Sequence, residues 1–151
     1  MSEQSSATTW PLEMVSSACS SYIGRQPLWV IIGQPVFLGF GCLNTKGTAI
    51  HELLHAVGFF HEQSRPDRDA YVRIQWWNIL PWNWSQFTKR WTINSLGSPY
   101  DYDSVMHYGN RAFSWNGFKT IVARDDPNRV LGQRDGFSES DIEQVNNLYG
   151  C

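Results

Sequence analysis

The stretch His51-Glu-Leu-Leu-His-Ala-Val-Gly-Phe-Phe-His61 carries three imidazoles and a carboxylate at fixed spacings. In a helix, the i, i+4 spacing places His51 and His55 on one face, about one turn apart, where both can bind a single ion. Glu52 lies beside them, placed to reach a water bound to that ion rather than the ion itself. Gly58 lets the chain leave the helix with positive φ, so that His61 can return as a third ligand. Three nitrogen ligands and an open position predict a catalytic zinc site rather than a structural one.

His51 and His55 could also belong to an ordinary helix face. From this pair alone, a metal site and an ordinary helix face are equally open interpretations. Gly58 and His61 at their set positions favour the metal site. The helix is predicted from about residue 48 to 57, with Asn44 or Thr45 as its N-cap. It is apolar on nearly all sides, which predicts a buried helix. Buried imidazoles and a buried carboxylate need partners, and a metal supplies them directly.

The composition predicts one domain with its own core and excludes several classes of partner. The chain has 151 residues, a net charge of −2 and no long run of like charge. Nucleic acid and anionic membranes are therefore not expected partners, and no apolar run approaches the ~18 residues of a membrane span. The three cysteines form no Cys-x-x-Cys pair, so a thiolate zinc site is not suggested. One disulfide and one leftover thiol are the simplest count and are typical of a secreted protein, although no signal peptide is visible at Met1.

The rest of the chain predicts short elements. Strands are expected at 19–25, 28–32, 36–40, 71–74 and 120–123, and a helix at 81–90. Ser138 and Asp141 predict a capping box that opens a final helix with an apolar face of Ile142, Val145, Leu148 and Tyr149. Residues 1–18 form an unassigned leader. Five of the eight tryptophans lie within 76–91; packing in the core and against neighbouring residues is the preferred interpretation, and an aromatic surface for a polymeric protein substrate or matrix is the alternative.

Three segments resemble the astacin family of zinc endopeptidases, which belongs to the metzincins. They are His51 to Asp69, the segment Ser104-Val-Met-His-Tyr-Gly109 that resembles the Met-turn, and the ending Asn146-Asn-Leu-Tyr-Gly-Cys151. The resemblance runs from about Cys19 to Cys151, and the hatching enzymes are the most similar type. It implies an α+β, metzincin-like fold. A partial N-terminal sheet and the zinc helix would occupy 19–61, and an irregular subdomain closed by a final helix would occupy 62–151.

The resemblance also implies roles at the metal. One Zn²⁺ per chain would be bound by His51, His55 and His61. Glu52 would be the general base on the attacking water, and Tyr108 would donate a hydrogen bond to the oxyanion. Met106 would form the apolar floor beneath the metal.

Further positions would bind substrate or hold the fold together. Ser20, Ser21 and Tyr22 would form the edge strand along which the substrate backbone aligns. Arg134 would line the pocket just after the scissile bond and favour acidic side chains there; the alternative is a surface arginine. Cys19 and Cys42 would form a disulfide.

Together these roles imply a secreted, zinc-dependent endopeptidase that acts on protein substrates, and the alternative is a catalytically inactive zinc-binding fragment or interaction module. The family's catalytic domain begins well before Cys19, so the resemblance implies a chain truncated at its N-terminus. Glu62, which meets the mature N-terminus in the family, is then expected to be buried and unpaired. A third alternative is a chain that does not fold stably because a sheet edge and part of the core are exposed.

Overall fold

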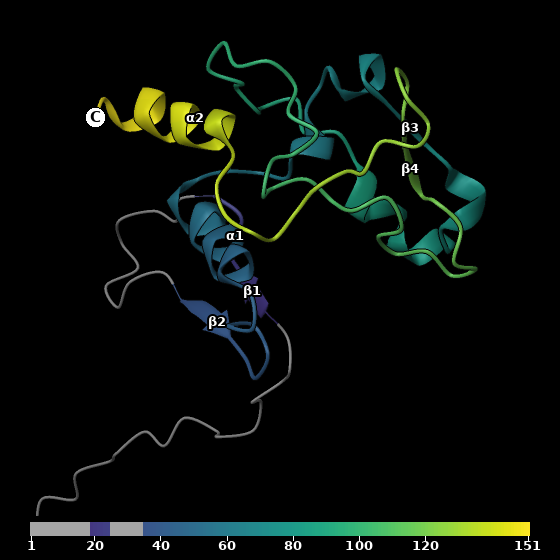
Figure 1. Ribbon diagram of the computed structural model, residues 1–151, viewed down its shortest axis with the longest axis horizontal. Coiled ribbons are helices and arrows are strands. Elements are labelled where there is room, and N and C mark those ends of the chain that lie inside the picture. The colour runs from purple at the N-terminus through teal and green to yellow at the C-terminus, as the bar shows by residue number, and fades with distance from the viewer. Residues whose placement is uncertain (1–18, 25–34) are drawn as a thin grey trace, which may run out of the picture.

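The computed structural model describes residues 19–24 and 35–151 (Figure 1). Its strands are β1 (Cys19–Ser21), β2 (Val36–Leu38), β3 (Val72–Ile74) and β4 (Ile121–Ala123), and its α-helices are α1 (Lys46–Val57) and α2 (Glu139–Tyr149). Four 3-10 segments complete it: η1 (Glu62–Ser64), η2 (Arg68–Ala70), η3 (Trp76–Asn78) and η4 (Pro81–Phe87). The α+β class is confirmed. The leader at 1–18 and the strand expected at 28–32 lie outside the described residues.

The four strands form two small antiparallel sheets in different parts of the molecule. Ser20 of β1 lies opposite Phe37 of β2, and Arg73 of β3 lies opposite Val122 of β4. Figure 1 shows β1 and β2 beside α1, and β3 and β4 in a separate lobe. A Cys19–Cys42 disulfide joins β1 to the turn before α1, which confirms the expected pairing. In the described part of the chain, no helix is long and apolar enough to cross a membrane.

Two clusters of buried apolar side chains hold the fold. The larger one belongs to the lobe of β3 and β4 and consists of Val72, Ile74, Ile79, Phe87, Tyr100, Ile121, Ala123 and Leu131. The smaller one joins Leu54 of α1 to Val105 and Met106, with Phe59 and Val145 packed against it. The second cluster therefore connects the helix that carries two histidines to the segment predicted as the Met-turn.

Helix α1 differs from its prediction in exposure. It begins at Lys46 after Thr45, two residues earlier than expected. The Thr45 side chain caps no backbone N–H; its hydroxyl pairs instead with the Thr48 hydroxyl at 2.8 Å. The helix is buried on one side only, because Leu53 is 53% exposed and Val57 is 37% exposed. The prediction of a helix buried all round is wrong, since burial is confined to the positions around His51, Leu54 and His55, where Leu54 packs against Val105 and Met106.

Helix α2 confirms the predicted cap and, of the predicted apolar face, only Val145, which packs against the smaller cluster. The Asp141 N–H donates to Ser138 Oγ and the Ser138 N–H donates to Asp141 Oδ2, each at 2.9 Å, which is a complete capping box. Ile142, Leu148 and Tyr149 are each nearly half exposed, whereas Asp141 and Gln144 are buried. The docked Asp141 carboxylate therefore decides which face of α2 points inward.

The helix predicted at 81–90 is the 3-10 segment η4, Pro81–Phe87. Its N-terminal and C-terminal bonds run from Asn83 N–H to the Leu80 carbonyl (2.8 Å) and from Thr88 N–H to the Ser85 carbonyl (3.2 Å). These i to i−3 bonds are the 3-10 pattern, which serves short connecting segments. The predicted helix is thus present as a 3-10 helix that starts at Pro81, as expected, and ends at Phe87, three residues earlier than expected.

Candidate metal centre

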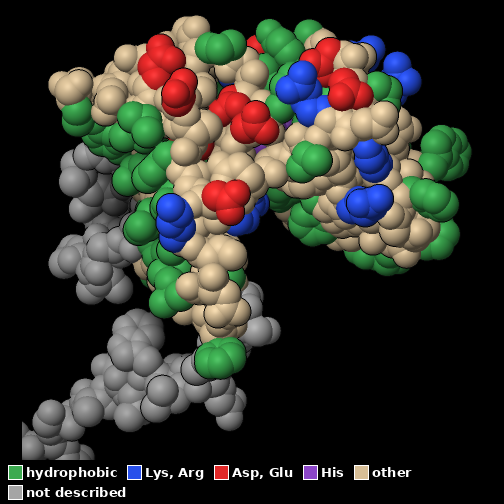
Figure 2. All heavy atoms as spheres, in the orientation of Figure 1, with side chains coloured by type: hydrophobic (Ala, Val, Ile, Leu, Met, Phe, Trp, Pro, Cys, Tyr) green, Lys and Arg blue, Asp and Glu red, His purple; other side chains and the backbone are tan. Residues whose placement is uncertain are grey.

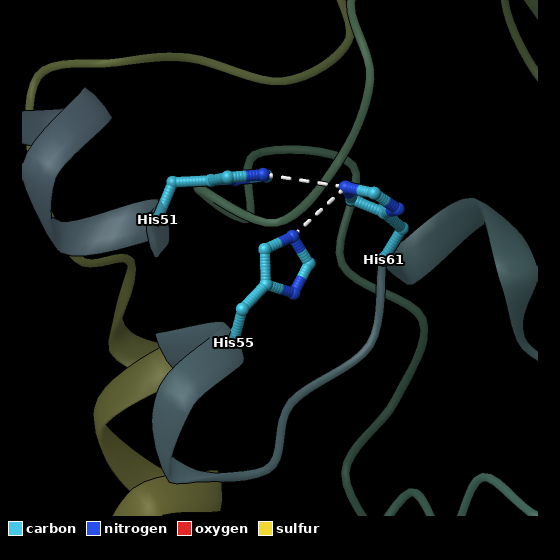
Figure 3. A group of neighbouring side chains, drawn as sticks. All are labelled: His51, His55 and His61. Carbon is cyan, nitrogen blue, oxygen red and sulfur yellow. Dashed lines mark hydrogen bonds between the residues drawn. The ribbon is translucent and has the colours of Figure 1, made fainter. Parts of the chain in front are cut away.

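The Nε2 atoms of three histidines converge on one point (Figure 3). His51 and His55 project from α1, and His61 projects from the segment that follows it. Nε2 of His61 lies 3.1 Å from Nε2 of His55 and 3.3 Å from Nε2 of His51. Zinc–nitrogen bonds of 2.0–2.1 Å in a tetrahedron separate two ligand atoms by roughly 3.3–3.4 Å. The three nitrogens therefore have the spacing that one zinc ion requires.

Hydrogen bonds behind the rings set the protonation of the donors. Nδ1 of His51 lies 2.8 Å from the Val105 carbonyl oxygen, and Nδ1 of His55 lies 2.8 Å from that of Phe59. A carbonyl only accepts, so each Nδ1 carries the proton and each Nε2 directs a lone pair to the centre. Converging lone pairs repel one another, and a bound cation satisfies them all.

Burial keeps the three rings neutral. Loss of hydration lowers the pKa of His51 to about 4 and that of His61 to about 2. The pKa of His55 is lowered for the same reason. A neutral imidazole is the form that binds a metal, so the donor set fits zinc in protonation as well as in spacing.

Gly58 brings His61 back to the helix. Its φ of 120° is a conformation that side chains rarely adopt, and its N–H donates to the His55 carbonyl at 3.0 Å. A Cβ at this position would meet nothing within 4 Å. The backbone angle, not space, thus requires glycine here, as the sequence predicted.

The segment predicted as the Met-turn packs against α1, and a buried carboxylate holds it. Met106 is buried against Leu54 and Val105. Asp141 of α2 accepts hydrogen bonds from Ser104 Oγ (2.6 Å) and the Val105 N–H (3.0 Å). Asp141 thus does more than cap its own helix, because the same carboxylate fixes the segment whose carbonyl orients His51. From the sequence, Asp141 was predicted only as a cap, because nothing local indicates a contact over 36 residues.

The histidines open onto a cleft of about 320 Å³. It lies between β1 and α1 on one side and Gln86 and Tyr108 on the other. Its walls comprise Cys19, Ser20, Ser21, Ile23, His51, Glu52, His55, His61, Gln86 and Tyr108. The structure therefore brings the predicted Glu52, Tyr108, Ser20 and Ser21 to the metal site. Tyr22 instead lines a different pocket with Phe37, and Gln86 and Ile23 were not predicted.

Glu52 and Tyr108 are the two side chains of this cleft lining that can act as acids, a carboxyl and a phenol. Burial raises the pKa of Glu52, while the Arg134 charge and a hydrogen bond from the Ser21 backbone oppose that rise. Burial also raises the pKa of Tyr108 to about 12, with the Glu52 charge adding to it and Arg134 opposing. The Tyr108 ring centroid lies 4.5 Å from that of His61. Tyr108 therefore holds its proton beside the metal site.

For Arg134 the structure contradicts only the alternative of a surface arginine, and for Glu62 it contradicts the expectation itself. Arg134 is half-buried rather than on the surface, and its Nη1 donates a hydrogen bond to the Val105 carbonyl oxygen at 2.9 Å. The same oxygen accepts the hydrogen bond from Nδ1 of His51. Glu62 is buried but paired, with Arg65 Nη1 at 3.0 Å and the Asp101 N–H at 2.9 Å. Burial raises the pKa of Glu62 to about 7. The expectation of an unpaired Glu62 is wrong because neighbours within the chain supply its partners.

Comparison with known proteins gives the relationship of the chain. Residues 3–150 match the family model of the astacin peptidases. The match extends further toward the N-terminus than the start near Cys19 expected from the sequence. The zinc metalloproteinase nas-13 of Caenorhabditis elegans is 53% identical over 137 residues, which are 88% of this chain and 29% of that protein. High choriolytic enzyme 1 of Oryzias latipes is 51% identical over 112 residues, 74% of this chain and 41% of that protein.

A solved structure agrees in fold. That of high choriolytic enzyme 1, a hatching enzyme zinc-protease of the medaka fish, is similar with a TM-score of 0.81 at 44% identity. The likeness covers 90% of this chain and 66% of that one. Of the curated relatives, the chain covers 29% of nas-13 and 41% of high choriolytic enzyme 1, so it spans less than half the length of each. With its fold, its three-histidine zinc site and its sequence in agreement, the chain belongs to the astacin family of zinc metalloproteinases.

Proposed function

We propose that the protein is a zinc-dependent endopeptidase that hydrolyses peptide bonds in extended protein substrates. The observation that carries this proposal is one cleft lined by three converging imidazoles, Glu52 and Tyr108. Zinc held by His51, His55 and His61 supplies the Lewis acidity that polarises the scissile carbonyl and lowers the pKa of a water. The other steps fall to side chains of this chain.

Glu52 is the general base that takes the proton of the attacking water and returns it to the leaving amine. Its raised pKa makes the carboxylate a stronger base and brings it nearer the working pH, which is what such a role needs. Tyr108 keeps its phenolic proton and donates a hydrogen bond to the developing oxyanion. Met106 packs as the apolar floor beneath the ligands.

The substrate lies along β1. Among the described strands β1 pairs with β2 alone, and Ser20 and Ser21 line the cleft, so a substrate strand can add to the other edge, with Tyr22 at its end. Arg134, whose charge acts on Glu52 and the ligands, favours acidic side chains after the scissile bond. In this proposal residues 19–61 and 62–151 are two subdomains that meet at the cleft, preceded by the leader 1–18. The disulfide supports an extracellular location.

The test is hydrolysis of casein by the zinc-loaded protein, by its Glu52→Gln variant and in the presence of a chelator. Because Glu52→Gln removes the base and leaves the ligands, zinc content should stay the same while kcat falls by about 10²–10⁴-fold. Glu143→Gln, which changes an exposed acid on α2, is the control and should cleave normally. Cleavage that resists the chelator, or that survives in Glu52→Gln, would refute the mechanism. A folded, zinc-loaded but inert protein would indicate a non-catalytic zinc-binding module.

A further inference from the structure

The tryptophans of residues 76–91 are exposed, so the prediction of packing in the core is wrong, while the prediction of local packing holds for Trp76 and Trp84, whose rings meet edge to face. Exposure reaches 92% for Trp77, and Trp76, Trp82, Trp84 and Trp91 are also exposed. Figure 2 shows hydrophobic side chains gathered at the outer edge of the lobe that carries β3 and β4. Trp76, Trp77, Trp84, Ser85 and Thr88 line a groove of about 530 Å³, called here the tryptophan groove. Contiguous exposed apolar surface of this kind marks a binding site.

Two walls of the tryptophan groove are held in place without a ligand. The Trp84 indole N–H donates to the Ile79 carbonyl at 3.1 Å. The rings of Trp76 and Trp84 meet edge to face with centroids 5.7 Å apart, and Trp76 also packs edge to face on the buried Phe87 at 6.2 Å. Because these indoles are already ordered, a ligand that stacks on them loses little further conformational entropy.

The lining defines the chemistry of the occupant. Among the described residues, no charged side chain lines the groove, and its polar groups are the hydroxyls of Ser85 and Thr88. Grooves lined by aromatic and uncharged side chains bind extended polypeptide segments whose residues carry rings and adopt the polyproline II conformation. Such segments lose little conformational entropy on binding. An acidic or basic segment would gain no ion pair from this lining and would lose hydration.

Segment η4 connects the groove to the cleft of the metal centre. Ser85 lines the groove, and the next residue, Gln86, lines the cleft. Phe87 packs against Tyr108, with ring centroids 6.0 Å apart. The cleft and the tryptophan groove thus meet the same short segment at neighbouring residues, within the reach of one extended polypeptide. This continuity favours polypeptide over a glycan or a lipid surface as the occupant.

We propose that the tryptophan groove is an exosite for an uncharged segment of the protein substrate, rich in proline and tyrosine, outside the residues held in the cleft. The proposal rests on the proposed peptidase function. It adds a determinant of substrate choice that is separate from the metal centre and from Arg134.

The kinetic test uses two fluorogenic peptides with the same scissile sequence. One carries a proline- and tyrosine-rich extension, and the other a glycine- and serine-rich extension of equal length. Trp77→Ala should raise KM for the ring-rich peptide by about fivefold to tenfold, the size of one interface anchor, and leave its kcat and the other peptide unchanged. Trp91→Ala, which changes an exposed ring beside Lys89 and outside the groove, is the control and should change neither. Equal KM values for both peptides with the unaltered protein, or an equal loss for both in Trp77→Ala, would overturn the exosite.

A binding measurement separates this proposal from the proposed function. Zinc-loaded Glu52→Gln should bind the ring-rich extension peptide in calorimetry, and the double variant with Trp77→Ala should bind it about fivefold to tenfold more weakly. Binding without any cleavage by the unaltered protein would leave the groove standing and refute the peptidase. Cleavage without groove-dependent binding would support the peptidase and refute the exosite. Trp77-dependent binding of an N-acetylglucosamine oligosaccharide or of neutral lipid vesicles, with none of the peptide, would overturn the choice of occupant.

Discussion

The two parts of the molecule that meet at the metal centre are built differently. Residues up to His61 supply all three ligands and the carboxylate, yet in their described portion only Cys42 and Leu54 are buried apolar side chains. Residues 62–151 contribute the larger core and the segment that holds the ligands in place. Val105 accepts from His51, and Val105 is itself fixed by Asp141. The part that supplies the metal chemistry therefore depends on the other part for its rigidity.

His61 is where the two parts join, so its loss should have the largest effect. Loss of a partner behind a ligand costs about 10–100-fold in metal affinity. His61→Ala, which removes a ligand itself, should therefore lower zinc affinity by more than about 100-fold and abolish cleavage. Competition with a chromophoric chelator measures the affinity, and Leu53→Ala on the exposed face of α1 is the control. Zinc binding as tight as that of the unaltered protein would show that His61 is not a ligand.

A leucine pair tests the contrast in packing directly. Leu131 is 1% exposed in the larger core, and Leu53 is 53% exposed on α1. Leu131→Ala should lower the free energy of unfolding by about 2–5 kcal/mol, because it removes buried methylenes and leaves a cavity. Leu53→Ala should change it by less than about 0.5 kcal/mol. Urea unfolding of the zinc-loaded proteins gives both values, and similar losses in the two variants would contradict the division into a packed and an exposed part.

Asp141→Asn tests whether the second part positions the ligands of the first. The amide keeps the shape of the carboxylate but cannot accept all the bonds from Ser104, Val105 and Ser138. The free energy of unfolding should fall by about 1.5–3 kcal/mol, and zinc affinity should fall by about tenfold. Glu143→Gln on the exposed side of α2 should alter neither quantity. A loss of stability with no change in zinc affinity would confine Asp141 to the helix cap.

The smallest expected effect lies at an ion pair wholly within the second part. Arg65 donates two hydrogen bonds to Asp67 and so lowers the pKa of its carboxyl, which is 46% exposed. Because the folded pKa lies below the unfolded one, this contribution is present above about pH 4 and is lost as the pH falls through the folded pKa.

Asp67→Asn should therefore cost at most about 1 kcal/mol at neutral pH, and the difference from the unaltered protein should shrink toward zero as the pH falls through the lowered folded pKa of Asp67. Urea unfolding across this range measures it. Asp135→Asn, which removes a carboxylate that forms no ion pair with any described residue, is the control. A difference that grows as the pH falls would give the wrong sign for the pair.

The metal site could be predicted because its ligands lie within one helix and the turn after it. The spacing of His51 and His55, the conformation of Gly58 and the return of His61 are all local properties. The partners that fix them are not local: His51 meets Val105 over 54 residues, and nothing in either stretch indicates that contact. The outward faces of α1 and α2 were mispredicted for a related reason, since an apolar stripe predicts burial only where another element covers it.

The Cys19–Cys42 disulfide makes the rigidity of the cleft depend on the redox state of the compartment in which the protein is produced. One wall of the cleft, β1, is tied to the segment before α1 through this bond, which joins residues 23 positions apart in the sequence. Such a loop is worth about 3 kcal/mol of stability in the chain-entropy model. In a reducing cytosol that constraint is lost, while the three residue pairs of β1 with β2 remain. Recombinant production in an oxidising compartment is therefore a condition for a fair measurement of substrate binding, even where zinc loading is complete.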